Sequence, residues 1–237
     1  MEIQNRVTNH YSNVILFKPA TPNANDESSA PPQLAPLMIL EVISANSPDL
    51  WKHPLPQKNK PPRIQAHKNS LLIDNRWHWQ WTYTWDEATS PAGAPRFQGV
   101  RVTLDSRDAP VIWEILADTS AYEIIYVSQT LDWAARAEFG PPLPGRKFSI
   151  ERSLAASPKV VVANVIEDGP TTIGPILYQQ ASNRDITALI CRCMPAQFKN
   201  LIAQEDYKLL AAPSKKRGKS IFSPTPLEQR LRLPSRF

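Results

Sequence analysis

Residues 77–85 read Trp-His-Trp-Gln-Trp-Thr-Tyr-Thr-Trp, and this stretch decides the fold class. Aromatic and polar residues alternate strictly over nine positions, which is the period of a β-strand with two different faces. We interpret the aromatic face as one layer of a hydrophobic core, because each buried ring removes about 150–250 Å² from water. The alternative is a ligand platform on which bases or sugars stack. The candidate residues of that platform are Trp77, Trp79, Trp81 and, from the opposite face, His78.

The polar face of the same strand, which begins at His78, is predicted to be at least partly solvated. A turn-rich stretch follows, and residues 97–104 alternate again with Gly99 as a bulge, which predicts a hairpin. Asp108 is a credible N-cap, and the apolar spacing after it predicts a helix over residues 109–118. We expect helices to cover the tryptophan layer. Trp79 and Trp81 should be buried against Val111 and Ile115 of this helix and against the last predicted helix of the chain.

The rest of the chain predicts alternating short elements. Gly140 and Pro141 end a predicted helix over residues 131–139, and a stiff proline-rich connector follows. Four successive strands with short connections favour an antiparallel meander. Together these elements predict an α+β fold with a mainly antiparallel sheet and two or three helices. The predicted strands cover residues 122–127, 147–152, 159–166, 173–179 and 186–193, and the last helix covers residues 196–210.

Proline use divides the chain into three predicted parts. Prolines number 24 of 237 residues, about twice the usual share of roughly 5%, and ten of them precede residue 63. Residues 1–69 are therefore expected to be an extended proline-rich region with strands at 14–17 and 37–43. A compact α+β domain is expected over residues 70–213, and a basic tail over residues 214–237.

The positive charge of the chain is concentrated in that tail. The formal net charge is +5, and residues 214–237 carry seven Lys and Arg against Glu228 alone, which leaves the other residues near −1. We hypothesise that the tail is loosely ordered when free and binds an anionic surface, either an acidic patch of a partner protein or a nucleic acid. The alternative is a solvated tail that only aids solubility. The candidate binding residues are Lys215, Lys216, Arg217, Lys219, Arg230, Arg232 and Arg236.

Several chemistries lack their motifs in this sequence. The seven glycines are not spaced as a dinucleotide-binding or phosphate-binding loop, and no serine-hydrolase or zinc-protease motif occurs. Cys191 and Cys193 are the only cysteines, and we expect both to be reduced and free of metal. No apolar run is long enough for a signal peptide or a membrane span. We therefore expect a cytoplasmic protein without a cofactor or metal, and we assign no catalytic residue.

The leading hypothesis is a non-enzymatic interaction or accessory protein of a larger intracellular assembly. Its extended arms would dock other proteins, since long and weakly hydrophobic segments are costly to order without a partner. The first alternative is a nucleic-acid-binding accessory protein that uses the basic tail and the aromatic strand. The second alternative is an enzyme without a local motif, with its site near His78. The proline-rich run at residues 138–146 is interpreted as a stiff connector, the alternative being a polyproline ligand for an aromatic groove.

Overall fold

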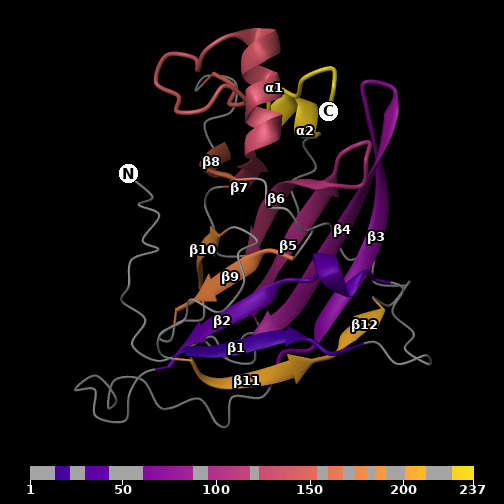
Figure 1. The fold of residues 1–237 in the computed structure, drawn as a ribbon, viewed down its shortest axis with the longest axis vertical. Coiled ribbons are helices and arrows are strands. Elements are labelled where there is room, and N and C mark those ends of the chain that lie inside the picture. Colours follow the sequence, from indigo (N-terminus) through magenta and orange to yellow (C-terminus); the bar gives the residue numbers. More distant parts are fainter. Residues whose placement is uncertain are drawn as a thin grey trace.

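Two β-sheets face each other, and one helical layer lies at one end of the larger sheet (Figure 1). A computed structural model describes residues 14–21, 30–42, 61–87, 96–117, 123–153, 160–167, 174–180, 185–190, 201–211 and 226–237. Strands make up most of these residues, and the described part of the chain holds two α-helices and one 3₁₀ turn. The α+β prediction is therefore confirmed only coarsely, because strand content far exceeds helix content.

The larger sheet has seven strands in the order β12-β3-β4-β5-β6-β7-β8. Strands β3 to β7 form antiparallel pairs in chain order, whereas the two outermost strands pair in parallel. The sheet is thus mixed, with an antiparallel centre. Its strands are β3 (Ile64–Ile73), β4 (Arg76–Glu87), β5 (Arg96–Leu104), β6 (Pro110–Ala117), β7 (Glu123–Ser128), β8 (Val160–Ile166) and β12 (Leu209–Ala211).

The smaller sheet has five strands in the order β10-β9-β2-β1-β11. It joins segments from both ends of the sequence, because β2 pairs with β9 in parallel and β1 pairs with β11 in parallel. The N-terminal strands therefore lie in the middle of a sheet rather than in a separate extended region. Its strands are β1 (Val14–Pro19), β2 (Leu37–Glu41), β9 (Ile176–Gln179), β10 (Ile186–Ile190) and β11 (Leu201–Tyr207).

The main hydrophobic core fills the space between the two sheets. Strand β4 supplies Trp81, Tyr83 and Trp85 to it, and the facing sheet supplies side chains such as Phe17 and Leu177. The predicted strand over residues 77–85 and its antiparallel pairing with β5 are confirmed. Two polar contacts also cross between the sheets: the Gln179 side-chain amide donates to the Gln98 side-chain oxygen, and the Leu189 amide donates to the Tyr126 hydroxyl. Apolar side chains from two facing sheets thus form the core of a β-sandwich.

A second apolar cluster covers the outer face of the seven-stranded sheet at one end. It is capped by α1 (Gln129–Phe139) and by a C-terminal segment that contains α2 (Leu227–Arg230) (Figure 1). The predicted helix over residues 131–139 is confirmed and begins two residues earlier, with Ser128 as its N-cap. The Ser128 hydroxyl accepts from the Leu131 amide, and Gly140 ends the helix with a φ of +82°.

Two predicted helices are wrong. Residues 109–118 form strand β6, in which consecutive side chains Val111, Ile112 and Trp113 are all buried because both faces of the sheet are covered. A strand buried on both faces has a continuous apolar run, which sequence periodicity does not separate from a helix. Asp108 is not an N-cap but lies in the β5–β6 turn with a φ of +60°. The end of the predicted helix over residues 196–210 is strand, since β11 and the start of β12 occupy it.

The predicted antiparallel meander is also wrong, because its strands separate into different sheets. Strand β8 pairs in parallel with β7 in the larger sheet, while β9 and β10 belong to the smaller sheet. Residues 147–152 form turns with one isolated bridge between Glu151 and Leu231, not a strand. Gly99 is not a bulge: it lies in regular register opposite Thr84, and an added Cβ would be 2.4 Å from the Tyr83 carbonyl oxygen.

Candidate functional site

The aromatic face of β4 is only partly covered. Tyr83 and Trp85 lie in the core, Trp81 is 6% exposed, Trp79 is 44% exposed and Trp77 is 69% exposed. The twelve residues of β4 extend beyond the shorter strands of the facing sheet, so Trp77 and Trp79 at the start of β4 have no opposite layer. The prediction that Trp81 is buried is confirmed. The prediction that Trp79 is buried is wrong.

The neighbours predicted for the tryptophan layer are also corrected. Ile115 packs against the same core as Trp81, but Val111 belongs to the cluster beneath α1. The last helix that was expected to cover the tryptophans is replaced by β11 and the start of β12, which pair with β1 and β3. With that covering element absent from the described residues, Trp77 and Trp79 remain at the surface.

Strand β3 places an apolar and a cationic side chain beside the exposed tryptophans. Leu72 pairs with Trp77 across the hairpin and is 47% exposed, while Lys68 pairs with Trp81. The Lys68 ammonium lies 3.6 Å from the centre of the Trp79 ring and 5.6 Å from that of Trp81. This cation–π contact favours one orientation of the Trp79 ring. We call Lys68, Leu72, Trp77 and Trp79 the aromatic surface.

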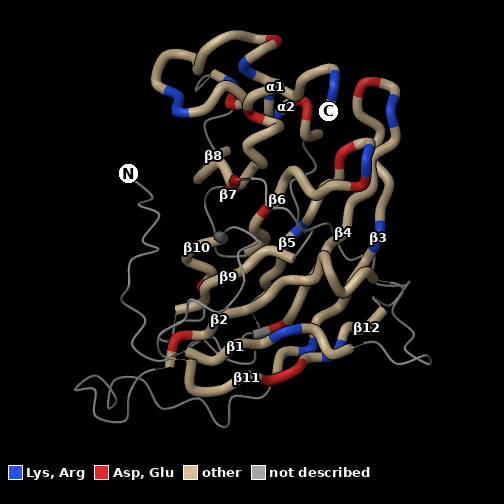
Figure 2. The backbone as a smooth tube through the Cα atoms, viewed as in Figure 1, with Lys and Arg blue, Asp and Glu red and all other residues tan. Residues whose placement is uncertain are grey.

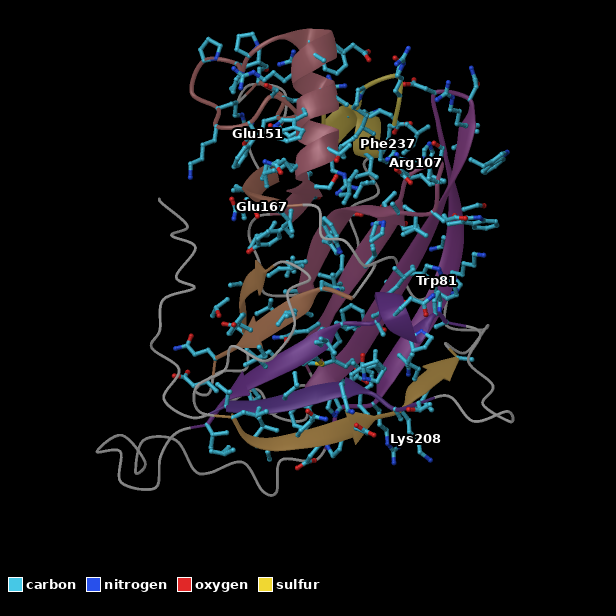
Figure 3. All side chains as sticks on the ribbon, in the orientation of Figure 1. Trp81, Arg107, Glu151, Glu167, Lys208 and Phe237 are labelled. Carbon is cyan, nitrogen blue, oxygen red and sulfur yellow. The ribbon has the colours of Figure 1, made fainter. Side chains whose placement is uncertain are left out.

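A cavity adjoins the aromatic surface where the hairpin meets the segment of residues 30–36. Its volume is about 420 Å³, within the range of roughly 300–1,000 Å³ for small-ligand sites. Trp79 belongs to both the cavity and the aromatic surface, so the two form one continuous feature (Figure 3 labels Trp81, which also lines it). The cavity is lined by Pro31, Gln33, Leu34, Lys68, Trp79, Trp81, Leu104 and Asp108.

Two buried tyrosines hold the segment of residues 30–36 against the core. The Tyr83 hydroxyl donates to the Pro31 carbonyl over 3.4 Å, and the Tyr207 hydroxyl donates to the Pro36 carbonyl over 2.7 Å. Burial raises the pKa of both hydroxyls, and for Tyr207 the nearby Tyr83 raises the pKa further. Both groups therefore stay protonated at neutral pH and remain donors to the proline carbonyls.

The polar face of β4 is buried, which corrects the prediction of a solvated polar face. His78 is 2% exposed, its Nδ1 lies 3.1 Å from the Leu104 carbonyl oxygen, and its ring stacks on Phe237 at 4.4 Å between centroids. Phe237 lies at the end of the molecule that holds α1, far from Lys208 (Figure 3). The C-terminal segment thus supports the hairpin from behind and leaves its aromatic side exposed.

The described part of the predicted basic tail is folded. Arg230 is 5% exposed and its guanidinium contacts Glu114 at 2.6 Å and Glu123 at 3.2 Å. Glu114 is itself buried beneath the segment and is also 3.4 Å from Arg101. The hypothesis of a loosely ordered tail is therefore wrong for residues 226–237, because burial of their apolar and charged side chains holds them on the sheet.

The other predicted binding residues of the tail differ in their contacts. Arg232 donates to the Phe139 carbonyl and lies over its ring, while its backbone amide donates to Ile150. Ser235 donates to the Glu138 carboxylate from both its amide and its hydroxyl. Arg236 is exposed. The predicted binding residues Lys215, Lys216, Arg217 and Lys219 lie outside the described residues, so their role stays a prediction.

Comparison of the chain with protein-family models, curated proteins and solved structures gives no match. Among the residues that the structure describes, no helix is both long enough and apolar enough to span a membrane. Within the same ranges, no three His, Cys, Asp or Glu side chains gather where they would hold a metal ion. Cys191 and Cys193 lie outside the described residues.

Sequence reasoning identified Trp77, Trp79 and Trp81 but missed Lys68, Leu72 and the cavity. The dipeptide Asp74-Asn75 could have indicated the hairpin, because it forms a two-residue turn with φ values of +46° and +61°. Such a turn sets the register of the hairpin and places Leu72 opposite Trp77. The cavity had no local signal, because one of its walls comes from residues 31–34, far away in the sequence.

Proposed function

We propose that this chain is a non-enzymatic interaction protein that docks a partner protein through the aromatic surface. The observation that carries the proposal is the exposure of three adjacent large apolar side chains, Leu72, Trp77 and Trp79, on the face of the hairpin opposite the buried His78 and Gln80. Adjacent exposed apolar side chains on a folded protein typically mark an interaction site. This proposal places docking on the hairpin, whereas the sequence had suggested the extended arms.

The support beneath the aromatic surface favours binding. Phe237 stacks on His78 and Ile73 packs into the cluster beneath the C-terminal segment, so the hairpin is held on the face opposite the aromatic surface. A rigid surface loses little conformational entropy when a partner binds. Tryptophan is enriched among the few residues that dominate binding energy at interfaces, and the two exposed tryptophans suit that role.

The size of the surface limits the kind of partner. From the exposed fractions of the three apolar side chains, about 300–400 Å² of apolar area is available. A stable dimer buries about 800 Å² on each partner, so this patch is too small for a permanent interface on its own. It is suited to a short segment of a partner or to a transient complex.

A second candidate function is binding of single-stranded nucleic acid, which the position of Lys68 beside Trp79 favours. The other charges around the hairpin do not favour nucleic-acid binding. Arg76 at the hairpin tip is accompanied by Asp74, and Arg107 by Asp108, so both signs occur together (Figure 2). Nucleic-acid surfaces are typically dominated by positive charge. A protein partner is therefore the better-supported function.

The test compares three forms of the full chain as bait in an extract of its native cells. The variant W77S/W79S removes the aromatic surface, and W133S is the matched control, since Trp133 on α1 is 60% exposed. We expect a protein that is retained by the wild type and by W133S and is lost from W77S/W79S. With that protein purified, its Kd should rise at least tenfold for W77S/W79S.

Two outcomes contradict the proposal. Equal retention of all partners by W77S/W79S and the wild type would show that the aromatic surface is not the docking site. A nuclease-sensitive complex, whose affinity falls steeply with salt, would instead assign the surface to nucleic acid. Circular dichroism of each variant before the assay shows that the fold is retained.

A further inference from the structure

We infer that the partner segment is an extended, proline-containing peptide that lies across the aromatic surface and enters the cavity beside Trp79. This inference rests on the proposed function and names the chemical class of its partner. The supporting observation is that the aromatic face of β4 already binds a proline-rich segment of the same chain, residues 30–36.

That internal segment is extended at both ends, and Ala35 has the backbone angles of a polyproline helix. Pro31 has φ −65° and ψ 116°, Ala35 has φ −68° and ψ 145°, and a 3₁₀ turn at Pro32–Leu34 separates them. A polyproline backbone leaves its carbonyl oxygens without internal hydrogen bonds. Here aromatic side chains supply the donors, because Tyr83 donates to Pro31 and Tyr207 donates to Pro36. Tyrosine hydroxyls from both sheets, Tyr83 on β4 and Tyr207 on β11, thus bind the carbonyls of these prolines.

The aromatic floor continues beyond the end of this internal segment. Pro31 and Leu34 form one wall of the cavity, and Trp79 and Trp81 form the other. From Trp81 to Trp77 the strand advances four residues, or about 13 Å at 3.3 Å per residue. That length is matched by about four residues of a polyproline helix at 3.1 Å each. The uncovered floor therefore has room for a second short segment of the same type.

The hairpin presents its face to such a segment rather than its edge. At the outer edge of the hairpin, strand β12 pairs with β3 only at Ile64–Ala66 among the described residues. Residues 67–70 of that edge read His-Lys-Asn-Ser, and exposed lysine and polar residues typically discourage the addition of another strand. The apolar side chains lie on the face instead.

A proline-containing segment also matches the small area. A peptide that is already extended before binding loses less conformational entropy than a flexible one, so a small apolar contact suffices. Aromatic-lined grooves bind polyproline segments in this way, with ring faces packed on proline rings and ring donors bonded to peptide carbonyls. Trp77 is 69% exposed, the Lys68 ammonium lies over one face of the Trp79 ring, and each tryptophan carries one indole N–H donor.

The test is a selection from a phage-displayed library of random 12-residue peptides against the full chain. We expect enriched peptides to contain at least two prolines, and the synthetic form of the best peptide to bind with a Kd at least tenfold weaker for W77S/W79S than for the wild type. The W133S variant should bind it with the wild-type Kd. Replacing the prolines of that peptide with alanine should weaken binding at least fivefold.

The outcomes separate this inference from the proposed function. Peptides that depend on Trp77 and Trp79 but show no enrichment of proline would overturn the inference and leave the docking surface in place. Peptides that bind W77S/W79S as well as the wild type would overturn both. A fluorescently labelled 15-nucleotide oligothymidylate provides the third arm, and tryptophan-dependent binding of this probe alone would assign the surface to nucleic acid and overturn both.

Discussion

Replacing Arg230 with methionine should destabilise the protein strongly, because the substitution leaves a buried carboxylate short of its closest cation. Arg230 is 2.6 Å from Glu114, and both side chains are 5% exposed. Breaking a buried ion pair on one side costs about 3–5 kcal/mol. Arg101 remains 3.4 Å from Glu114 and offsets part of that loss. The contact to Glu123 adds little, since that carboxylate is 34% exposed and screened by solvent.

We therefore expect R230M to lower the free energy of unfolding by about 3 kcal/mol, the lower end of the range for a broken buried pair. For a chain of this size that loss corresponds to a fall in Tm of about 6–12 °C. The assay is urea denaturation followed by circular dichroism and tryptophan fluorescence, because urea does not screen charges. R236M is the matched control, since Arg236 belongs to the same segment but is exposed, and it should change stability by less than about 0.5 kcal/mol.

A double substitution completes the measurement. If Arg230 and Glu114 stabilise each other, the loss in E114M/R230M should be at least about 1.5 kcal/mol smaller than the sum of the two single losses. An R230M protein that is as stable as R236M would refute the reasoning. It would show that the ion pair between Arg230 and Glu114 does not stabilise the folded protein, and that the four buried apolar side chains of residues 226–237 hold this segment without it.

Three further predictions test other parts of the fold. Deleting residues 226–237 exposes the surface beneath four buried apolar side chains, each worth about 1.5–3 kcal/mol, so the truncated chain should lose its cooperative urea transition. Burial raises the pKa of Tyr83, Tyr126 and Tyr207 in the folded protein. Their contribution to the free energy of unfolding is therefore complete below pH 10 and is lost as the pH rises toward their folded-state pKa values. Stability should fall above pH 10 by up to about 4 kcal/mol per pH unit, and Y83F should reduce that slope by about a third in urea titrations at stepped pH. G99A should cost at least about 2 kcal/mol in the same assay, because its Cβ would meet the Tyr83 carbonyl oxygen; a stability equal to that of the wild type would disprove the close approach.

Local patterns were sufficient where a segment had one covered face or a strong end signal. The alternation over residues 77–85 predicted β4, because a strand with two different faces has a period of two residues. Gly140 predicted the end of α1, because its positive φ is readily adopted by glycine. The strands near residues 14–17 and 37–43 were also predicted, since proline-rich stretches bound short β-branched runs.

Long-range packing determined the rest. Residues 111–113 are buried on both faces, and a continuous apolar run has no periodicity that separates strand from helix. The C-terminal segment looked like a solvated tail because its arginines are close together in sequence, yet Arg230 meets Glu114, which lies 116 residues away. The exposure of Trp77 and Trp79 has the same origin. Their strand extends beyond the facing sheet, and which side chains a second sheet covers depends on strand lengths and registers that no single stretch of sequence contains.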